Sequence, residues 1–126
     1  MIAVIFEVWL DEAERPHYLQ LAAELAAHLQ QQAGFISVER FASLVSPDKL
    51  LSLSFWEDEA AVVRWRNHLS HRQTQAAGRA GVFRDYRLRV ASVSRDYGLN
   101  QRAEAPADSL QHHDGMTAPD SRGARA

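Results

Sequence analysis

The hydrophobic positions change their period several times along the chain, and each change marks a predicted element. Residues 2–10 are rich in β-branched and aromatic side chains, which favour a strand, and both faces of that strand are mostly apolar. From Pro16 onward, apolar residues recur at spacings of three and four, which predicts a helix that ends at Gly34. Its buried stripe is predicted to be Tyr18, Leu21, Ala22, Leu25, Ala26 and Leu29.

A hairpin is predicted next. Alternating positions indicate a strand over residues 35–45, and residues 50–56 form a second apolar run. Residues 46–49 contain Pro47 and Asp48, which are typical of turns. Because the connection is short, the two strands should pair antiparallel.

A second helix and a long last strand complete the ordered part. Asp58 can accept hydrogen bonds from free amide groups at a helix start, and Ala61, Val62, Trp65 and Leu69 form an apolar stripe in a helix that runs to about residue 77. Residues 82–96 are predicted as a strand. It exceeds the usual strand length, so we expect it to extend past its own sheet.

The element order β-α-β-β-α-β is that of the ferredoxin-like α+β fold, a four-stranded antiparallel sheet with two helices on one face. Two helices cover one face only, yet the strands are apolar on both. The other face should therefore meet the same face of a second copy in a homodimer, with the long last strand reaching across to the partner.

Composition sets the domain boundary. The chain has 126 residues, enough for one domain with its own core. The segment 98–126 contains no aromatic residue and few large apolar ones, so it cannot bury enough apolar surface to offset its ordering entropy. We therefore expect a folded domain over residues 1–97 and a disordered tail over residues 98–126.

Charge and cysteine usage exclude several classes of function. A formal net charge of −2 gives no basic excess for a nucleic-acid backbone. The chain has no cysteine, which removes disulfides, thiolate metal sites and cysteine nucleophiles and is compatible with a reducing compartment. The first apolar run is short and leads into acidic residues, unlike a signal peptide or a membrane span, so a cytoplasmic location is expected.

Several motifs occur in the order found in one known family. The run S-F-W-E-D-E-A-A-V (54–62), the helix W-R-N-H-x-x-H-R-x-x-Q (65–75), Gly78 with Arg79, and the closing D-Y-R-L-R-V (85–90) resemble the antibiotic biosynthesis monooxygenases, dimeric α/β barrels, over about residues 1–97. The resemblance implies oxygenation of phenolic polyketides or quinols without a cofactor. The same family includes haem-degrading enzymes and members of no known activity.

The resemblance to the haem-degrading branch is incomplete. Trp65 matches the helical tryptophan of that branch, but Phe6 and Glu7 stand where it carries an asparagine, and Gln75 stands where it carries the histidine that binds iron. Haem degradation by that route is therefore not expected. The chain also lacks a glycine-rich phosphate loop or dinucleotide motif, so we expect no nucleotide or flavin cofactor.

The candidate site residues gather on the second helix. One face of this helix roughly contains Trp65, His68 and Arg72, and His71 lies on the adjacent face. One interpretation is a pocket for a small apolar aromatic molecule, in which His68 or His71 deprotonates a phenol, since imidazole titrates near neutral pH. The predicted binding residues are Trp65, Arg72, Phe6, Phe55 and Trp56. The alternative interpretation is that Trp65 packs in the core and the histidines are polar surface residues.

Two further alternatives concern metal and charge. His68 and His71 are three residues apart, whereas helical zinc ligands are commonly four apart, so no metal site is expected. Glu7, Glu39, Arg87 and Arg89 lie on strands among apolar neighbours, where charges are costly unless paired, and salt bridges are the preferred interpretation. The sequence thus leaves two functions open, a cofactor-independent monooxygenase and a non-catalytic dimeric binding or structural module.

Overall fold

The computed structural model describes residues 1–68 and 81–109, and the chain divides into two compact units, Met1–Ser92 and Val93–Ala126. Each unit is described by itself. The first contains, in order, β1 (Ile2–Trp9), the short 3-10 helix η1 (Glu12–Glu14), α1 (Arg15–Gln30), β2 (Phe35–Ala42), β3 (Lys49–Trp56), α2 (Glu59–Arg66) and β4 (Asp85–Ser92).

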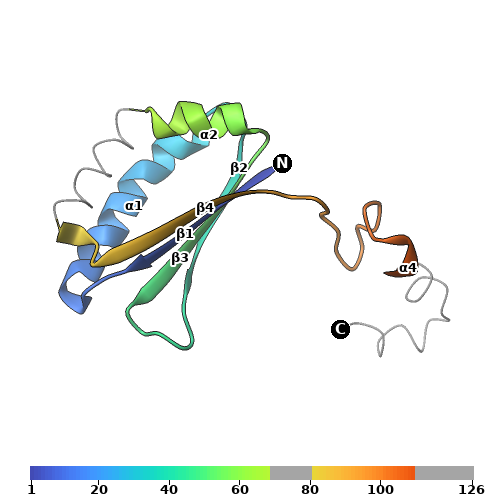
Figure 1. Ribbon diagram of the computed structural model, residues 1–126. Coiled ribbons are helices and arrows are strands. Elements are labelled where there is room, and N and C mark those ends of the chain that lie inside the picture. The colour runs from blue at the N-terminus through green and yellow to red at the C-terminus, as the bar shows by residue number, and fades with distance from the viewer. Residues whose placement is uncertain (69–80, 110–126) are drawn as a thin grey trace. The chain divides into compact units, whose positions relative to one another are not determined.

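The four strands form one antiparallel sheet in the order β2-β3-β1-β4, and α1 and α2 lie on one face of it (Figure 1). This arrangement is the predicted ferredoxin-like α+β fold. The first strand is central and pairs over its full length with both β3 and β4.

The pairing register places one residue from each strand in rows across the sheet. Arg40 pairs with Ser52, Ser52 with Phe6, and Phe6 with Leu88, so these four side chains share one row. This row faces the helices. Because side chains alternate, the neighbouring residues of each strand point to the opposite face.

Both helices begin as the sequence predicts, but α1 ends early. The Asp58 Oδ1 atom accepts a 2.8 Å hydrogen bond from the Ala61 amide at the start of α2, and Pro16 lies in the first turn of α1. The first helix ends at Gln30 rather than at Gly34. There the amides of Gln31 and Gln32 turn back to carbonyl groups of the last turn. The predicted continuation of the second helix to residue 77 lies outside the described residues.

Two strands are shorter than predicted. The Ser43 hydroxyl accepts hydrogen bonds from the amides of Val45 (3.1 Å) and Ser46 (3.0 Å), which starts the turn at once, so β2 ends at Ala42 instead of residue 45. The last strand spans Asp85–Ser92 instead of 82–96, because it pairs only as far as β1 provides a partner. The predicted pairing of the residues beyond Ser92 with a partner subunit stays a prediction.

The core between sheet and helices has two separate clusters. One contains Val8, Leu10, Tyr18, Leu50 and Val82. The other contains Leu29, Trp56, Ala61, Val62 and Trp65. The buried stripes predicted for both helices contribute to these clusters, and Leu69 of the second stripe lies outside the described residues.

The face opposite the helices carries paired charges. Glu7 lies 3.1 Å from the Lys49 ammonium group and 3.3 Å from the Arg89 guanidinium group. The salt bridges predicted for Glu7 and Arg89 are thus confirmed. Apolar side chains such as Leu53 and Phe55 share this face through the strand alternation.

The second unit is described over residues 93–109. The Arg102 guanidinium lies 5.5 Å from the centre of the Tyr97 ring, the Asp96 amide donates to the Glu104 carboxylate at 2.7 Å, and Ala107–Ser109 form one helical turn, α4. The predicted domain boundary near residue 98 and the predicted disorder beyond it stay predictions. Within the described ranges, no helix has the length and apolar character needed to cross a membrane.

Gly34 provides a test of the packing between the α1–β2 connection and α2. Its φ is +84°, and an added Cβ would lie 2.6 Å from the Ala61 Cβ. Gly34→Ala should therefore lower the free energy of unfolding by about 2 kcal/mol or more, measured by denaturant titration. The control is Gly81→Ala, where φ is +118° but no atom of residues 1–68 or 81–109 lies within 4 Å of the added Cβ. Its expected loss is smaller, about 1 kcal/mol. Equal losses would show that the contact with Ala61 does not matter.

Candidate functional site: an apolar pocket between sheet and helices

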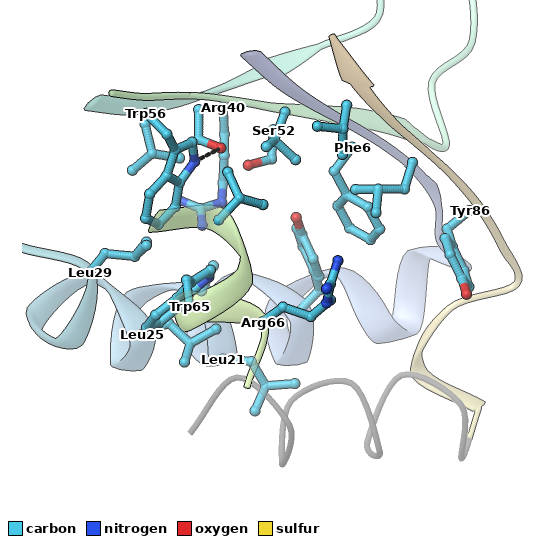
Figure 2. Close-up of a pocket in the computed structure, with 18 of the residues that line it drawn as sticks. Phe6, Leu21, Leu25, Leu29, Arg40, Ser52, Trp56, Trp65, Arg66 and Tyr86 are labelled. Carbon is cyan, nitrogen blue, oxygen red and sulfur yellow. Dashed lines mark hydrogen bonds between the residues drawn. The ribbon is translucent and has the colours of Figure 1, made fainter. Parts of the chain in front are cut away.

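A cavity of about 260 Å³ lies between the sheet and the helices (Figure 2). Its lining includes members of both core clusters, for example Tyr18 from one and Trp56 and Trp65 from the other. The core is therefore divided by a space that a small molecule can fill. Apolar and aromatic walls of this kind are typical of small-molecule sites.

Two tryptophans form one end of the pocket. Trp56 of β3 is only 2% exposed, and its ring centre lies 6.4 Å from that of Trp65 on α2. The Trp56 indole nitrogen donates a 2.9 Å hydrogen bond to the Ser54 hydroxyl, drawn as a dashed line in Figure 2. This bond satisfies the one polar group of the buried indole.

The other end is built from Phe6 of β1, Phe83 just before β4 and Tyr86 on β4. The Phe6 ring centre lies 5.7 Å from Phe83 and 5.8 Å from Tyr86. Tyr86, Leu88 and Val90 line the pocket from the edge strand, yet all three are about half exposed. The wall that β4 contributes is therefore the more open one.

A small set of polar side chains interrupts the apolar lining. Arg40 extends from the sheet and Arg66 from α2 into the same space (Figure 2). The remaining hydroxyl-bearing side chains of the described lining are Tyr18, Ser52, Ser54 and Tyr86.

Tyr18 is buried, and its hydroxyl is paired with Arg40. Burial raises the pKa of the Tyr18 phenol above its ordinary value, since the phenolate would lose hydration. The Arg40 charge and a hydrogen bond from its guanidinium to the phenol oxygen oppose this rise in pKa. The net result is a neutral phenol at physiological pH, held beside a permanent positive charge.

Three of the predicted binding residues line the pocket, namely Trp65, Trp56 and Phe6. Phe55 does not, because it precedes Trp56 on the same strand and so points to the opposite face of the sheet. The sequence interpretation that placed Phe55 beside Trp56 in one pocket is corrected on this point.

The structure describes one of the two predicted catalytic histidines, His68. The His68 ring stacks on Trp65, with centres 5.3 Å apart, and lies 5.4 Å from the His28 ring. His68 is half-buried and is not part of the pocket lining. His71 and Arg72 lie outside the described residues.

The sequence interpretation missed Arg40 and the two serines. A signal was present in the alternation of β3, where Ser52 and Ser54 share a face with Trp56, while large apolar residues fill the other face between them. Small polar residues on the helix-covered face indicate a cavity there. No group of three or more histidine, aspartate or glutamate side chains within residues 1–68 and 81–109 could hold a metal ion.

The fold and the pocket together define a small ferredoxin-like domain with an apolar ligand cavity. The family model for antibiotic biosynthesis monooxygenases matches residues 1–77, and the chain belongs to that family.

Similar proteins agree with this assignment. The jasmonate monooxygenase ABM of Pyricularia oryzae is 39% identical over 118 residues, which is 94% of this chain and 55% of that protein. The chain thus spans about half the length of this relative, and the match continues into the second unit.

Two solved structures share the fold. A Deinococcus radiodurans protein assigned to the antibiotic biosynthesis monooxygenases superimposes with a TM-score of 0.71 at 15% identity, covering 79% of this chain and 98% of its own. SnoaB of Streptomyces nogalater, a cofactor-independent oxygenase solved as a mutant protein, has a TM-score of 0.66 at 15% identity, covering 75% of this chain and 94% of its own.

The raised pKa of Tyr18 leads to a measurable alkaline effect. The unfolded chain ionises this phenol at a lower pH than the folded protein, so the free energy of unfolding should fall as pH rises from the unfolded pKa towards the folded one. In an absorbance titration of the three tyrosines, Tyr18→Phe should remove the last ionisation. Tyr86→Phe, which removes a half-exposed ring, should leave that ionisation in place. Its loss in Tyr86→Phe alone would contradict the assignment.

Proposed function

We propose that the chain is a monooxygenase that acts without a cofactor on a small apolar aromatic molecule, such as a phenol, a hydroquinone or a polyketide-like compound. The observation that carries the proposal is the cavity bordered by Trp56, Trp65 and Phe6 in a chain of this family. A module that only packs its helices on its sheet has no need of such a space. The cavity therefore favours the enzyme over the non-catalytic module.

The chemistry restricts the substrate. Without an external reductant, the substrate must supply all the electrons that reduce dioxygen. A methylene that becomes a ketone does so, because it loses two hydrogen atoms and gains one oxygen atom, while the second oxygen leaves as water. A phenol oxidised to a quinone does the same, with one hydrogen lost from the ring carbon and one from the hydroxyl. Deprotonation to an electron-rich anion starts the reaction, and a dry pocket protects the intermediate from water.

His68 and His71 are the proposed proton acceptors. The stacking of His68 on Trp65 brings one imidazole next to a pocket wall and supports this role. Trp65 and Trp56 would hold the flat substrate, and Phe6 would contact its other end. Arg72 stays a proposed binding residue on its sequence position alone.

A second candidate substrate comes from the Pyricularia oryzae relative, whose name states that it oxygenates jasmonate. The high identity and the two pocket arginines favour this candidate. If the oxygen enters a saturated C–H group as a hydroxyl, dioxygen consumes two more electrons than that group supplies, so an oxygenation of this kind needs an added reductant. The ratio of reductant consumed to dioxygen consumed separates the two candidates.

We also propose that the chain forms a homodimer through the face opposite the helices. Leu53 and Phe55 lie on that face beside the Glu7 salt bridges, and neither α1 nor α2 covers it. A self-complementary twofold contact would bury these side chains in both subunits.

Oxygen consumption with a panel of hydroquinones and polycyclic phenols tests the enzymatic proposal. The native protein should exceed the autoxidation rate. Trp65→Ala should lose most of this activity because the pocket loses a wall, and the double variant His68→Ala, His71→Ala should be about a hundredfold slower or worse while staying folded.

The control for the histidines is His17→Ala, which removes an exposed imidazole at the start of α1. It should keep full activity. Unchanged activity in the double variant would remove both histidines from the mechanism. Absence of uptake across the panel, with and without added reductant, would contradict the monooxygenase proposal itself.

Sedimentation of the native protein tests the dimer. Leu53→Lys places a charge in the proposed interface and should give monomers at concentrations where the native protein is dimeric. The matched control, Val63→Lys, changes an exposed apolar residue on α2 and should stay dimeric. A native protein that sediments as a monomer would contradict this arrangement.

A further inference from the structure

The polar groups of the pocket share one electrostatic character. Arg40 and Arg66 both reach the cavity, and no aspartate or glutamate of the described chain lines it (Figure 2). The remaining lining is apolar apart from hydroxyl groups. An apolar cavity with two guanidinium groups and no acidic partner favours a ligand with a negative charge.

Arg40 is the more buried of the two arginines. Its Nε atom is buried and has no hydrogen-bond partner in the described part of the chain. Its guanidinium group donates to the Tyr18 hydroxyl, which is neutral and does not balance the charge. Arg40 as a whole is half-buried, so its charge is partly removed from water and favours an anionic partner, and a buried donor without a partner is rare in native proteins. Both features indicate that a group of the ligand completes the site.

The position of Arg40 in the cavity explains how a bound ligand can contact it. Arg40 pairs with Ser52 and shares a row with Phe6, so its side chain rises from the floor of the cavity. Trp56 and Trp65 border the same space. A ligand can therefore place a charged end at Arg40 and an apolar body between the aromatic walls.

We propose that the pocket binds a small apolar carboxylic acid in its ionised form, with the carboxylate against the Arg40 guanidinium and the Tyr18 hydroxyl donating to it. The planar guanidinium matches a carboxylate with two parallel hydrogen bonds, which a phenolate oxygen cannot accept in the same way. Arg66, which is exposed, attracts the anion to the site. That this ligand is the substrate rests on the proposed function, whereas the binding itself does not.

Binding measurements on the full chain test this inference. The probes are a graded set of arylalkanoic acids and medium-chain fatty acids, each beside its methyl ester, and the signal is quenching of the pocket tryptophans. Each ester keeps the apolar body and loses the charge. Where an acid fits, it should bind at least about tenfold more tightly than its ester.

Variants locate the effect. Arg40→Gln should weaken acid binding by about 10- to 100-fold and leave ester binding nearly unchanged, and Arg40→Lys should restore only part of the preference, since it keeps the charge but not the paired donors. Arg64→Gln is the control, because this exposed arginine of α2 bonds to the Ala33 carbonyl outside the pocket. It should bind both probes like the native protein. Thermal denaturation shows whether each variant is folded.

Equal binding of acids and esters by the native protein would overturn the inference, as would the absence of binding by every acid in the set. An equal loss for acid and ester in a folded Arg40→Gln protein would also overturn it. Acid binding without oxygen uptake would contradict the proposed function and leave the anion site intact. Oxygen uptake with neutral phenols and no preference for acids would contradict the anion site and leave the proposed function intact.

Discussion

The alternation of side chains along β3 is the constraint on which the rest of the structure depends. Ser52 and Ser54 face the helices, whereas Leu53 and Phe55 face away from them. A core strand normally carries the reverse pattern, with large apolar residues under the helices. In the middle of this strand the two serines leave a cavity inside, and the large side chains of the other face leave an apolar surface outside. The pocket and the proposed dimer interface are thus two results of one pattern.

The fold can contain this cavity because densely packed residues lie at both ends of the cavity. Val8, Leu10 and Leu50 pack at one end, and Leu29, Trp56 and Ala61 at the other. An empty space in a single continuous core would cost the dispersion contacts that its lining loses. Divided into two clusters, the core keeps dense packing on either side of the ligand space. A bound molecule would restore the missing contacts and raise the stability of the fold.

The element order could be predicted from the sequence because periodicity is a local property. The helix that begins at Asp58 and the hairpin around Pro47 follow from signals within a few residues. Element ends were less predictable. The end of β4 depends on where β1 begins, and the end of β2 depends on the Ser43 hydroxyl. Neither can be read from the strand's own pattern.

The candidate site was predictable only where apolar and functional signals coincide. Trp56, Trp65 and Phe6 are large aromatic residues that any core would recruit, and they line the pocket. Tyr18 and Arg40 are far apart in the sequence and meet only because α1 packs across the sheet. Phe55 was misplaced because its aromatic character was given more weight than its position on the strand.

Arg40 lies on β2, an edge strand with one neighbour, whereas β1 has a neighbour on each side. A substitution at an edge disturbs fewer cross-strand contacts than one in the centre of a sheet. The residue that sets the charge of the pocket is therefore separated from the strand that holds the sheet together. Related chains could exchange the side chain at this position, and with it the class of molecule they accept, while the fold stays the same.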